Sequence, residues 1–381
     1  MAGWYPVVSL TGPRQSGKST LVKRAFPDYG YVTLEDPQLR ASALEDPISF
    51  IRNRPRRLII DEAQYAPDLF SMIQVASDED GAPGQYILTG SQNFLMMKSI
   101  GQSLAGRVGL LRLLPFSFWE LQNSIGQTLD VDRFTLQGGY PRLHDNNIPP
   151  SVFFPSYVDT YIERDVAGVL DVRNKDSFRK LLAMCAQGVG GLVNMTSLAG
   201  DAGVSTPTVK SWLSVLESSF IVFRLRPYFS NMRKRLVKTP KLYFYDTGLL
   251  CSLLRIETVE QLVESPQFGA VFENFVVAET MKRHLGNGEQ PELYFYRDEG
   301  KREIDLLDFT RPSCKQAVEI KSSMMYHDKY ARHLSAVCPD LGIGEENRFV
   351  VSRVASSYKA RDCKVVAARD WLMAQDSGPW S

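Results

Sequence analysis

Nine consecutive residues near the amino terminus have the types and spacing that bind phosphate. The pattern G-x-x-x-x-G-K-[ST] and the threonine after it are filled by Gly12, Pro13, Arg14, Gln15, Ser16, Gly17, Lys18, Ser19 and Thr20. Glycines let backbone N–H groups turn toward phosphate oxygens. Lys18 would reach the β and γ phosphates of ATP, and the Ser19 hydroxyl would bind Mg²⁺. The pattern therefore predicts a site for ATP and Mg²⁺, against the alternative of a chance loop.

The elements around this loop must present it to a nucleotide. An apolar run at residues 7–10 predicts a buried strand, and residues 18–26 predict a helix whose positive end faces the same anion. A second run of branched residues ends in Asp61 and Glu62, as a central parallel strand does where its carboxyl end meets the nucleotide. We expect Asp61 to hold Mg²⁺ and Glu62 to position or deprotonate the attacking water.

Two further residues are candidates for the same chemistry. Ser91 follows a third apolar run, at residues 86–89, and could bind the γ-phosphate or the lytic water. A plain turn at the end of the strand is the alternative. Arg107 could stabilise transition-state charge, in its own chain or in a neighbouring subunit. A surface salt bridge explains this arginine nearly as well.

A local concentration of positive charge follows in the middle of the chain. Helical patterns at residues 178–186, 196–203 and 205–216 precede two apolar runs, at residues 220–225 and 241–245, which is the order of a winged helix. Between residues 224 and 241 there is no acid, and the basic residues are Arg224, Arg226, Arg233, Lys234, Arg235, Lys238 and Lys241. Such a patch suits nucleic acid, with DNA favoured. Winged helices also bind proteins, and a basic hairpin can simply be solvated.

A second set of carboxylates lies in the last third of the sequence. Asp305 and then Glu319-x-Lys321 have the spacing of a PD-(D/E)XK nuclease core, and Glu273 stands at the place of the helical carboxylate in that family. Glu319 and Lys321 share one face of a strand because side chains alternate. Asp305 and Glu319 could bind Mg²⁺ while Lys321 orients water. A buried ion-pair cluster, or a nuclease fold used only for binding, are the alternatives.

Taken with residues 115–121 (PFSFWEL) and 137–141 (QGGYP), these motifs resemble a large family of bacterial and archaeal AAA+-type ATPases. In that family a domain similar to the PD-(D/E)XK nucleases follows the ATPase, and the resemblance covers essentially the whole chain. It implies an α/β fold with a P-loop NTPase parallel sheet, then a winged helix, then a PD-(D/E)XK-like α/β domain. Homo-oligomerisation is implied only by this resemblance.

Composition limits the remaining possibilities. The 381 residues carry a formal net charge of +1, and no apolar run approaches the roughly 20 residues that span a bilayer, so we expect a cytoplasmic protein without a membrane partner. The five cysteines form no C-x-x-C pair, which argues against a disulfide framework or a zinc site. We predict an ATPase domain at 1–145, a helical connector with the winged helix at 146–265, and the nuclease-like domain at 266–381.

The predicted function is ATP hydrolysis of the AAA+ type, coupled to engagement of nucleic acid. One alternative is an ATP-regulated, Mg²⁺-dependent DNA endonuclease whose chemistry lies at Asp305, Glu319 and Lys321. A second alternative is an ATP-controlled scaffold that recruits a protein through the winged helix. The three readings share the nucleotide site and differ in what the rest of the chain contacts.

Overall fold

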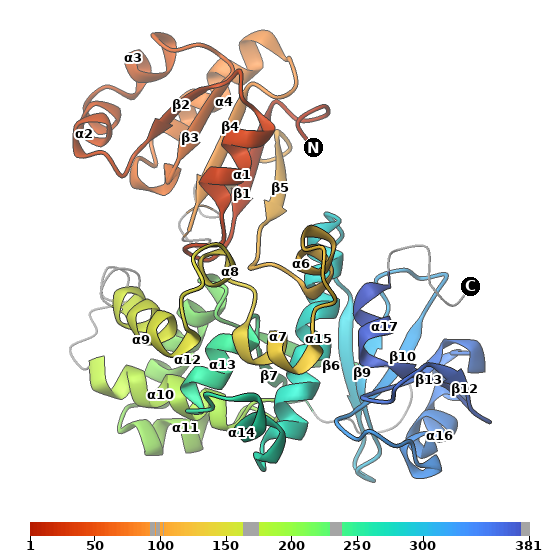
Figure 1. Ribbon diagram of the computed structural model, residues 1–381. Coiled ribbons are helices and arrows are strands. Elements are labelled where there is room, and N and C mark those ends of the chain that lie inside the picture. The colour runs from red at the N-terminus through yellow and green to blue at the C-terminus, as the bar shows by residue number, and fades with distance from the viewer. Residues whose placement is uncertain (92–95, 97–99, 102, 163–174, 229–237, 375–381) are drawn as a thin grey trace. The chain divides into compact units, whose positions relative to one another are not determined.

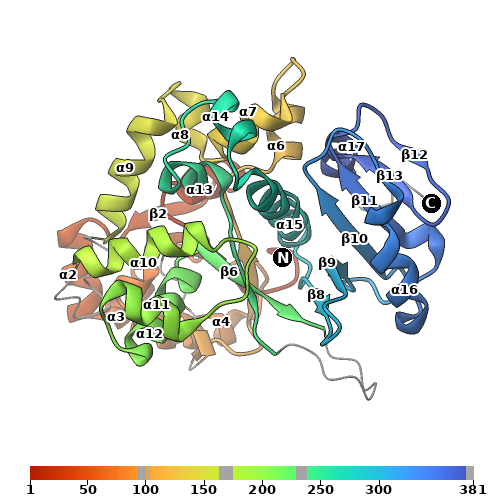
Figure 2. The same cartoon turned by 90° about the horizontal axis from the view of Figure 1, so that it is seen from below.

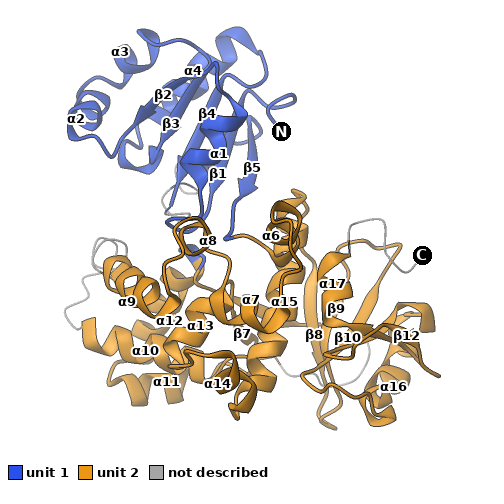
Figure 3. Cartoon of the chain, viewed as in Figure 1, with its two compact units in different colours: residues 1–115, 218–220 blue, residues 116–217, 221–381 orange. Residues whose placement is uncertain are grey.

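A computed structural model describes residues 1–381 except 92–95, 97–99, 102, 163–174, 229–237 and 375–381 (Figure 1). The chain divides into two compact units (Figure 3). Unit 1 comprises residues 1–115 and 218–220, and unit 2 comprises residues 116–217 and 221–381. The three-domain division expected from the sequence is finer than this partition and stays a prediction.

Unit 1 is built on a five-stranded parallel sheet with strand order β2-β3-β4-β1-β5 (Figure 1). The strands are β1 (Val7–Thr11), β2 (Gly30–Thr33), β3 (Leu58–Asp61), β4 (Tyr86–Gly90) and β5 (Val108–Arg112). The described helices between them are α1 (Lys18–Ala25), α2 (Pro37–Glu45), α3 (Pro47–Arg52), the 3-10 turn η1 (Ala63–Tyr65) and α4 (Leu69–Asp80). Parallel pairing requires such crossover connections. Unit 1 is therefore an α/β domain with a parallel sheet, as the sequence predicts.

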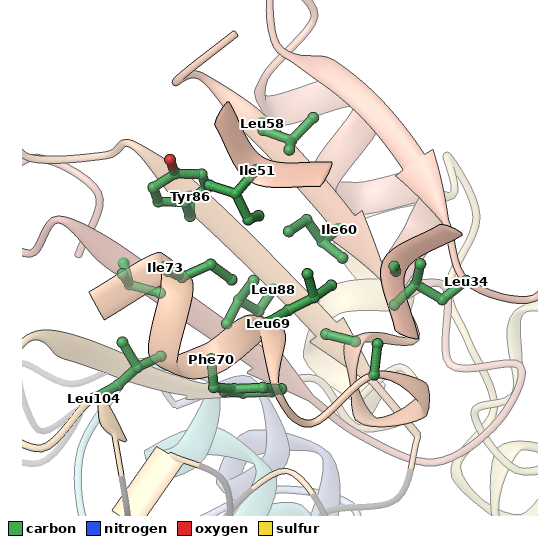
Figure 4. Close-up of a cluster of buried hydrophobic side chains, with 14 of the residues drawn as sticks. Leu34, Ile51, Leu58, Ile60, Leu69, Phe70, Ile73, Tyr86, Leu88 and Leu104 are labelled. Carbon is green, nitrogen blue, oxygen red and sulfur yellow. The ribbon is translucent and has the colours of Figure 1, made fainter. Parts of the chain in front are cut away.

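The core of unit 1 lies on both faces of this sheet. Leu58 and Ile60 point to one face, where they belong to one buried cluster with Phe70 of α4 (Figure 4). Ile59 points to the other face, in a separate cluster with Val22 of α1. Successive side chains of β3 point to opposite faces of the sheet, and both faces are buried. The strand is therefore a continuous apolar run in the sequence.

Unit 2 contains the remaining helices. Before the long helix they are α6 (Phe118–Ser124), α7 (Val131–Gln137), α8 (Pro141–Asp145), α9 (Pro150–Tyr161), α10 (Lys175–Gln187), α11 (Met195–Ala202), α12 (Thr206–Ser218), α13 (Thr247–Leu253) and α14 (Val259–Glu264). The long helix and those after it are α15 (Phe268–Gly286), the 3-10 turns η3 (Asp328–Tyr330) and η4 (Glu345–Asn347), α16 (Arg332–Leu341) and α17 (Ala368–Met373). Among the described residues, no helix is long and apolar enough to cross a membrane.

One mixed sheet of eight strands runs through unit 2, in the order β12-β13-β11-β10-β9-β8-β6-β7 (Figure 2). Its strands are β6 (Val222–Pro227), β7 (Lys241–Phe244), β8 (Leu293–Arg297), β9 (Glu303–Asp308), β10 (Gln316–Lys321), β11 (Arg348–Ser352), β12 (Tyr358–Lys359) and β13 (Lys364–Ala367). The expected hairpin is present as the antiparallel pair β6–β7. It is also joined to the sheet, because β6 pairs in parallel with β8 through Arg226 and Tyr294. The hairpin is therefore part of the sheet that carries Asp305 and Glu319.

Candidate nucleotide site and a second charged cluster

The phosphate loop, residues 12–19, connects the end of β1 to the start of α1. Lys18 opens the helix, is 5 % exposed, and its Nζ donates to the carbonyl oxygens of Gly12 (3.0 Å) and Pro13 (2.8 Å). Gly17 takes a left-handed φ of 92°, and no side chain caps the first turn of α1. The sequence also places no acid in that turn. These features fit a phosphate group at the N-terminus of α1.

Gly12 is required by the close approach of a neighbouring segment. A Cβ atom at this position would lie 2.0 Å from the carbonyl oxygen of Leu113, just after β5. Any larger residue would push the start of the phosphate loop away from the sheet. The remaining predicted loop residues continue from this point, with Gln15 in the left-handed region at φ 61° and Ser16 donating to the Pro13 carbonyl oxygen at 3.0 Å.

Asp61 lies at the carboxyl end of β3 and collects three hydroxyl groups. Ser19 Oγ donates to Asp61 Oδ2 at 2.7 Å, Tyr31 Oη donates to the same oxygen at 2.6 Å, and the Thr89 hydroxyl donates to Oδ1. The structure thus brings together Ser19 and Asp61, the two predicted Mg²⁺ ligands. Burial and the adjacent Asp61 raise the pKa of Tyr31 above its ordinary value, so the phenol remains a donor.

Glu62 is held beside Asp61 in an unusual backbone conformation. Its φ of 55° is in the left-handed region, and its side chain is buried. Oε2 accepts hydrogen bonds from Ser91 Oγ at 3.0 Å and from Gln64 Nε2 at 2.5 Å. A Cβ atom on Gly90 would lie 2.6 Å from Gln64 Oε1, so this glycine makes room for the amide. Ser91, predicted as a contact to phosphate or water, orients Glu62 in this structure.

Arg107 lies at the amino end of the strands, opposite the end that carries the phosphate loop. β5 runs parallel to β1, with Val108 opposite Val7, so Arg107 precedes the amino ends of both strands while the phosphate loop follows the carboxyl end of β1. The five residues of each strand separate these two ends by about 16 Å. The guanidinium donates to both carboxylate oxygens of Asp78, at 2.6 and 3.0 Å. In the described part of the chain Arg107 therefore pairs with Asp78 rather than with the nucleotide site, and its role in its own chain or toward another subunit stays a prediction.

The predicted basic patch is only partly at the surface. Arg226 and Lys238 are exposed, whereas Arg224 makes two 2.6 Å hydrogen bonds to Glu217. Lys241 is 3 % exposed and lies in the interior of unit 2. Its assignment to a surface that binds nucleic acid is therefore corrected. Three residues of the patch fall outside the described part of the chain: Arg233, Lys234 and Arg235.

A second charged cluster forms around α15, β9 and β10. Lys321 Nζ contacts Glu319 Oε1 at 2.7 Å and Asp305 Oδ2 at 3.3 Å. The backbone N–H of Ile320 also donates to Asp305 Oδ2, at 2.8 Å. Burial, followed by the negative charge of Asp305, raises the pKa of Glu319 to about 8. Asp305, Glu319 and Lys321 are thus in contact, as their spacing predicts.

The fourth predicted member, Glu273 on α15, is held by Lys241, which the sequence assigned to the basic patch, and by Tyr243, which it did not single out. Lys241 Nζ contacts Glu273 Oε1 at 2.9 Å, and Tyr243 Oη donates to the same oxygen at 2.6 Å. Lys241 also contacts Glu303 at 2.6 Å. A signal was present, because Lys241 opens a strand whose other residues are Leu, Tyr and Phe. Within the described ranges, no three His, Cys, Asp or Glu residues are grouped to hold a metal ion.

Comparison with known families divides the chain into three consecutive parts. Residues 5–122 match a family described as an AAA domain, which contains the whole candidate nucleotide site. Residues 128–260 match a domain of unknown function (DUF8612), and residues 268–371 match another (DUF4143). The parallel sheet, the phosphate loop and this match together define an ATP-binding P-loop ATPase of the AAA class.

Two relatives each match 79 % of this chain. The uncharacterized protein Rv2008c of Mycobacterium tuberculosis is 34 % identical over 307 residues, covering 79 % of this chain and 67 % of that protein. The chain therefore belongs to the same family as this mycobacterial protein. The uncharacterized protein MJ1544 of Methanocaldococcus jannaschii is 22 % identical, covering 79 % of this chain and 71 % of its own length. The Walker-type ATPase PABY2304 of Pyrococcus abyssi aligns with a TM-score of 0.38 at 15 % identity, covering 66 % of this chain and 91 % of that one.

Proposed function

We propose that this chain hydrolyses ATP at the carboxyl edge of the unit 1 sheet and couples turnover to engagement of nucleic acid. The observation that carries the hydrolysis proposal is that Lys18 and Ser19, at the start of α1, lie in one site with Asp61 and Glu62, at the end of β3. A lysine, a hydroxyl and two carboxylates at the end of a parallel sheet are the groups that phosphoryl transfer to water requires.

Each residue has a distinct role in this proposal. Lys18 would exchange its two loop carbonyl partners for phosphate oxygens, which compensate its positive charge better. Ser19 and Asp61 would hold Mg²⁺, which neutralises charge on the β and γ phosphates when bound. Glu62, aligned by Ser91, would accept a proton from water as its oxygen attacks the γ-phosphorus. The bond between the γ-phosphorus and the bridging oxygen breaks, and ADP leaves with the electron pair.

Binding and hydrolysis can be separated with two variants. We expect Lys18→Ala to weaken binding of a fluorescent ATP analogue at least tenfold and to lower phosphate release about 100-fold, since it removes a direct phosphate contact. Glu62→Gln should retain binding and lose phosphate release. Arg24→Ala, an exposed change on the same helix, is the matched control. Unchanged binding and release in Lys18→Ala would refute the proposal.

The nucleic-acid part of the proposal is supported by the exposed cations Arg226 and Lys238. Each phosphate contact contributes roughly 0.9 to the slope of log affinity against log salt on duplex DNA. Replacing both residues with alanine should weaken binding to labelled duplex DNA and lower that slope by about 2, measured by fluorescence anisotropy. Arg361→Ala, another exposed arginine of unit 2, is the control. DNA affinity that neither change alters would favour the protein scaffold instead.

The endonuclease alternative depends on a different question. Asp305, Glu319 and Lys321 are in contact, but a metal-dependent cleavage site also needs carboxylate oxygens that a cation can reach. Lys241 contacts two carboxylates of the same region, Glu273 and Glu303, and so affects whether a cation can reach them.

A further inference from the structure

Lys241 carries a buried ammonium group in the interior of unit 2. It comes from β7, the second strand of the hairpin, and its side chain is 4 % exposed. Its Nζ lies 2.9 Å from Glu273 and 2.6 Å from Glu303. Burying a charge is costly unless it is paired, so these contacts fix the position of the lysine.

The four carboxylates of the core are divided between two lysines. Lys241 contacts Glu273 and Glu303, while Lys321 contacts Asp305 and Glu319. We call these six residues, together with Arg297, which contacts Glu303 at 3.2 Å, the carboxylate cluster. Because a metal ion binds deprotonated carboxylates, every group is counted as ionised, and the four carboxylates then exceed the three cations by one charge.

The two halves of the carboxylate cluster are close enough to influence each other. Burial raises the pKa of Glu273, and the negative charge of Asp305 raises it further, although the two have no direct hydrogen bond. Burial lowers the pKa of Lys241, but the carboxylates of Glu273 and then Asp305 outweigh it and raise the pKa. Glu319 Oε2 is buried and has no hydrogen-bond partner in the structure. The ammonium of Lys241 thus supplies positive charge beside acids that a cation would otherwise have to bridge.

We propose that Lys241 substitutes for a divalent cation in this core, so that the folded protein takes up Mg²⁺ or Mn²⁺ there only when Lys241 is removed. A divalent ion needs anionic oxygens that are free to coordinate it, and Lys241 already occupies Glu273. Adding a divalent charge while Lys241 remains would leave the carboxylate cluster with an excess of positive charge. Without Lys241 the excess of carboxylates is two, which matches one divalent cation.

The proposal gives the hairpin a function that its basic composition did not suggest. Lys241 lies in the region that matches DUF8612, whereas Glu273, Asp305 and Glu319 lie in the region that matches DUF4143. The positive charge of Lys241, in the DUF8612 region, therefore compensates carboxylates of the DUF4143 region. This inference goes beyond ATP hydrolysis and does not depend on it.

Mn²⁺ binding to the full-length protein, followed by electron paramagnetic resonance without nucleotide, tests the proposal. We expect Lys241→Met to bind one Mn²⁺ more than wild type. Adding Glu319→Gln to Lys241→Met should remove the new site. Lys180→Met, at an exposed lysine of α10 in the same region, should bind like wild type. The nucleotide site is identical in all four proteins, so failure of the ATPase proposal would leave the comparison intact.

Two results would overturn the proposal. The first is a folded Lys241→Met, verified by circular dichroism, that gains no Mn²⁺, because the lysine is then only a structural ion-pair partner. The second is a wild-type protein that binds Mn²⁺ at a site lost in Glu319→Gln. If Lys241→Met does not fold, Lys241→Gln takes its place in the comparison, and loss of a wild-type Mn²⁺ site in Glu319→Gln still refutes the proposal.

Discussion

The carboxylate of Asp246 joins two segments of unit 2 that lie far apart in the chain. It is 2 % exposed, and Oδ2 accepts the N–H of Gly139 at 2.8 Å. Oδ1 accepts the N–H of Leu249 at 3.0 Å and so caps α13. Gly138 has a φ of 75°, and a Cβ atom there would lie 2.4 Å from Asp246 Oδ1. Gly138 of the QGGYP motif is therefore explained by the approach of this aspartate, whereas a Cβ atom on Gly139 would lie 2.0 Å from the carbonyl oxygen of Phe116. Asp246→Ala should destabilise unit 2.

The size of the effect follows from the two hydrogen bonds. Loss of an N-cap costs about 1 kcal/mol. Loss of a buried hydrogen bond to a charged group costs about 2 kcal/mol, because the N–H of Gly139 is left without a partner. We therefore expect Asp246→Ala to lower the free energy of unfolding by about 3 kcal/mol in total. Asp246→Asn keeps one acceptor oxygen and should cost about half as much.

Urea unfolding followed by tryptophan fluorescence measures this, because Trp119, Trp212 and Trp371 report on unit 2. The matched control is Asp130→Ala, which removes an exposed cap of α7 that accepts a single N–H and should cost about 1 kcal/mol. The reasoning is refuted if Asp246→Ala lowers the free energy of unfolding no more than this control does, at an unchanged denaturant slope. In that case the hydrogen bond from Gly139 to the carboxylate does not stabilise unit 2.

Three other changes give distinct expectations. Burial raises the pKa of Glu319 from 4.5 to about 8. The contribution of this side chain to stability is therefore full below pH 4.5 and is lost as the pH rises toward 8. Glu319→Gln should flatten the pH dependence of the urea midpoint between these two pH values. Gly12→Ala places a Cβ 2.0 Å from a backbone oxygen and should lower the melting temperature and weaken binding of an ATP analogue, whereas Gly101→Ala, with open space around it, should change neither. Tyr31→Phe removes a donor to Asp61 and should lower kcat about tenfold in a phosphate-release assay while nucleotide affinity without Mg²⁺ stays within twofold.

The nucleotide site was predictable because its parts are local patterns. The strand expected at residues 7–10 is observed as Val7–Thr11, and the helix expected at residues 18–26 is observed as Lys18–Ala25. Each is short and contiguous, and its residue types follow from burial and from the loop chemistry. The partners of Asp61 were not predictable in this way. Tyr31 and Thr89 reach it because β2 and β4 flank β3, and strand order is a non-local property.

The hairpin shows the same limit in a sharper form. Its strands were expected from composition and are present as Val222–Pro227 and Lys241–Phe244. Its pairing with β8 joins residues 68 positions apart, at Arg226 and Tyr294, and no local pattern indicates this. A run of lysines and arginines predicts an exposed surface. Only the contacts of each side chain in the fold show whether one of them is buried. Lys241 departs from that reading because Glu273 and Glu303 compensate its charge in the interior.

The two acidic sites of this chain are balanced by chemically different groups, and that difference separates their expected behaviour. Asp61 is held by three neutral hydroxyl groups, so a cation that binds it displaces no charge. Glu273 and Glu319 are held by ammonium groups, and a cation that binds them must move a buried positive charge. The first arrangement favours reversible binding of Mg²⁺ with each nucleotide, whereas the second favours a core that keeps its own cations. A chain that loads Mg²⁺ in unit 1 and excludes it from unit 2 would use ATP without cutting nucleic acid, and Lys241→Met is the change that separates these two properties.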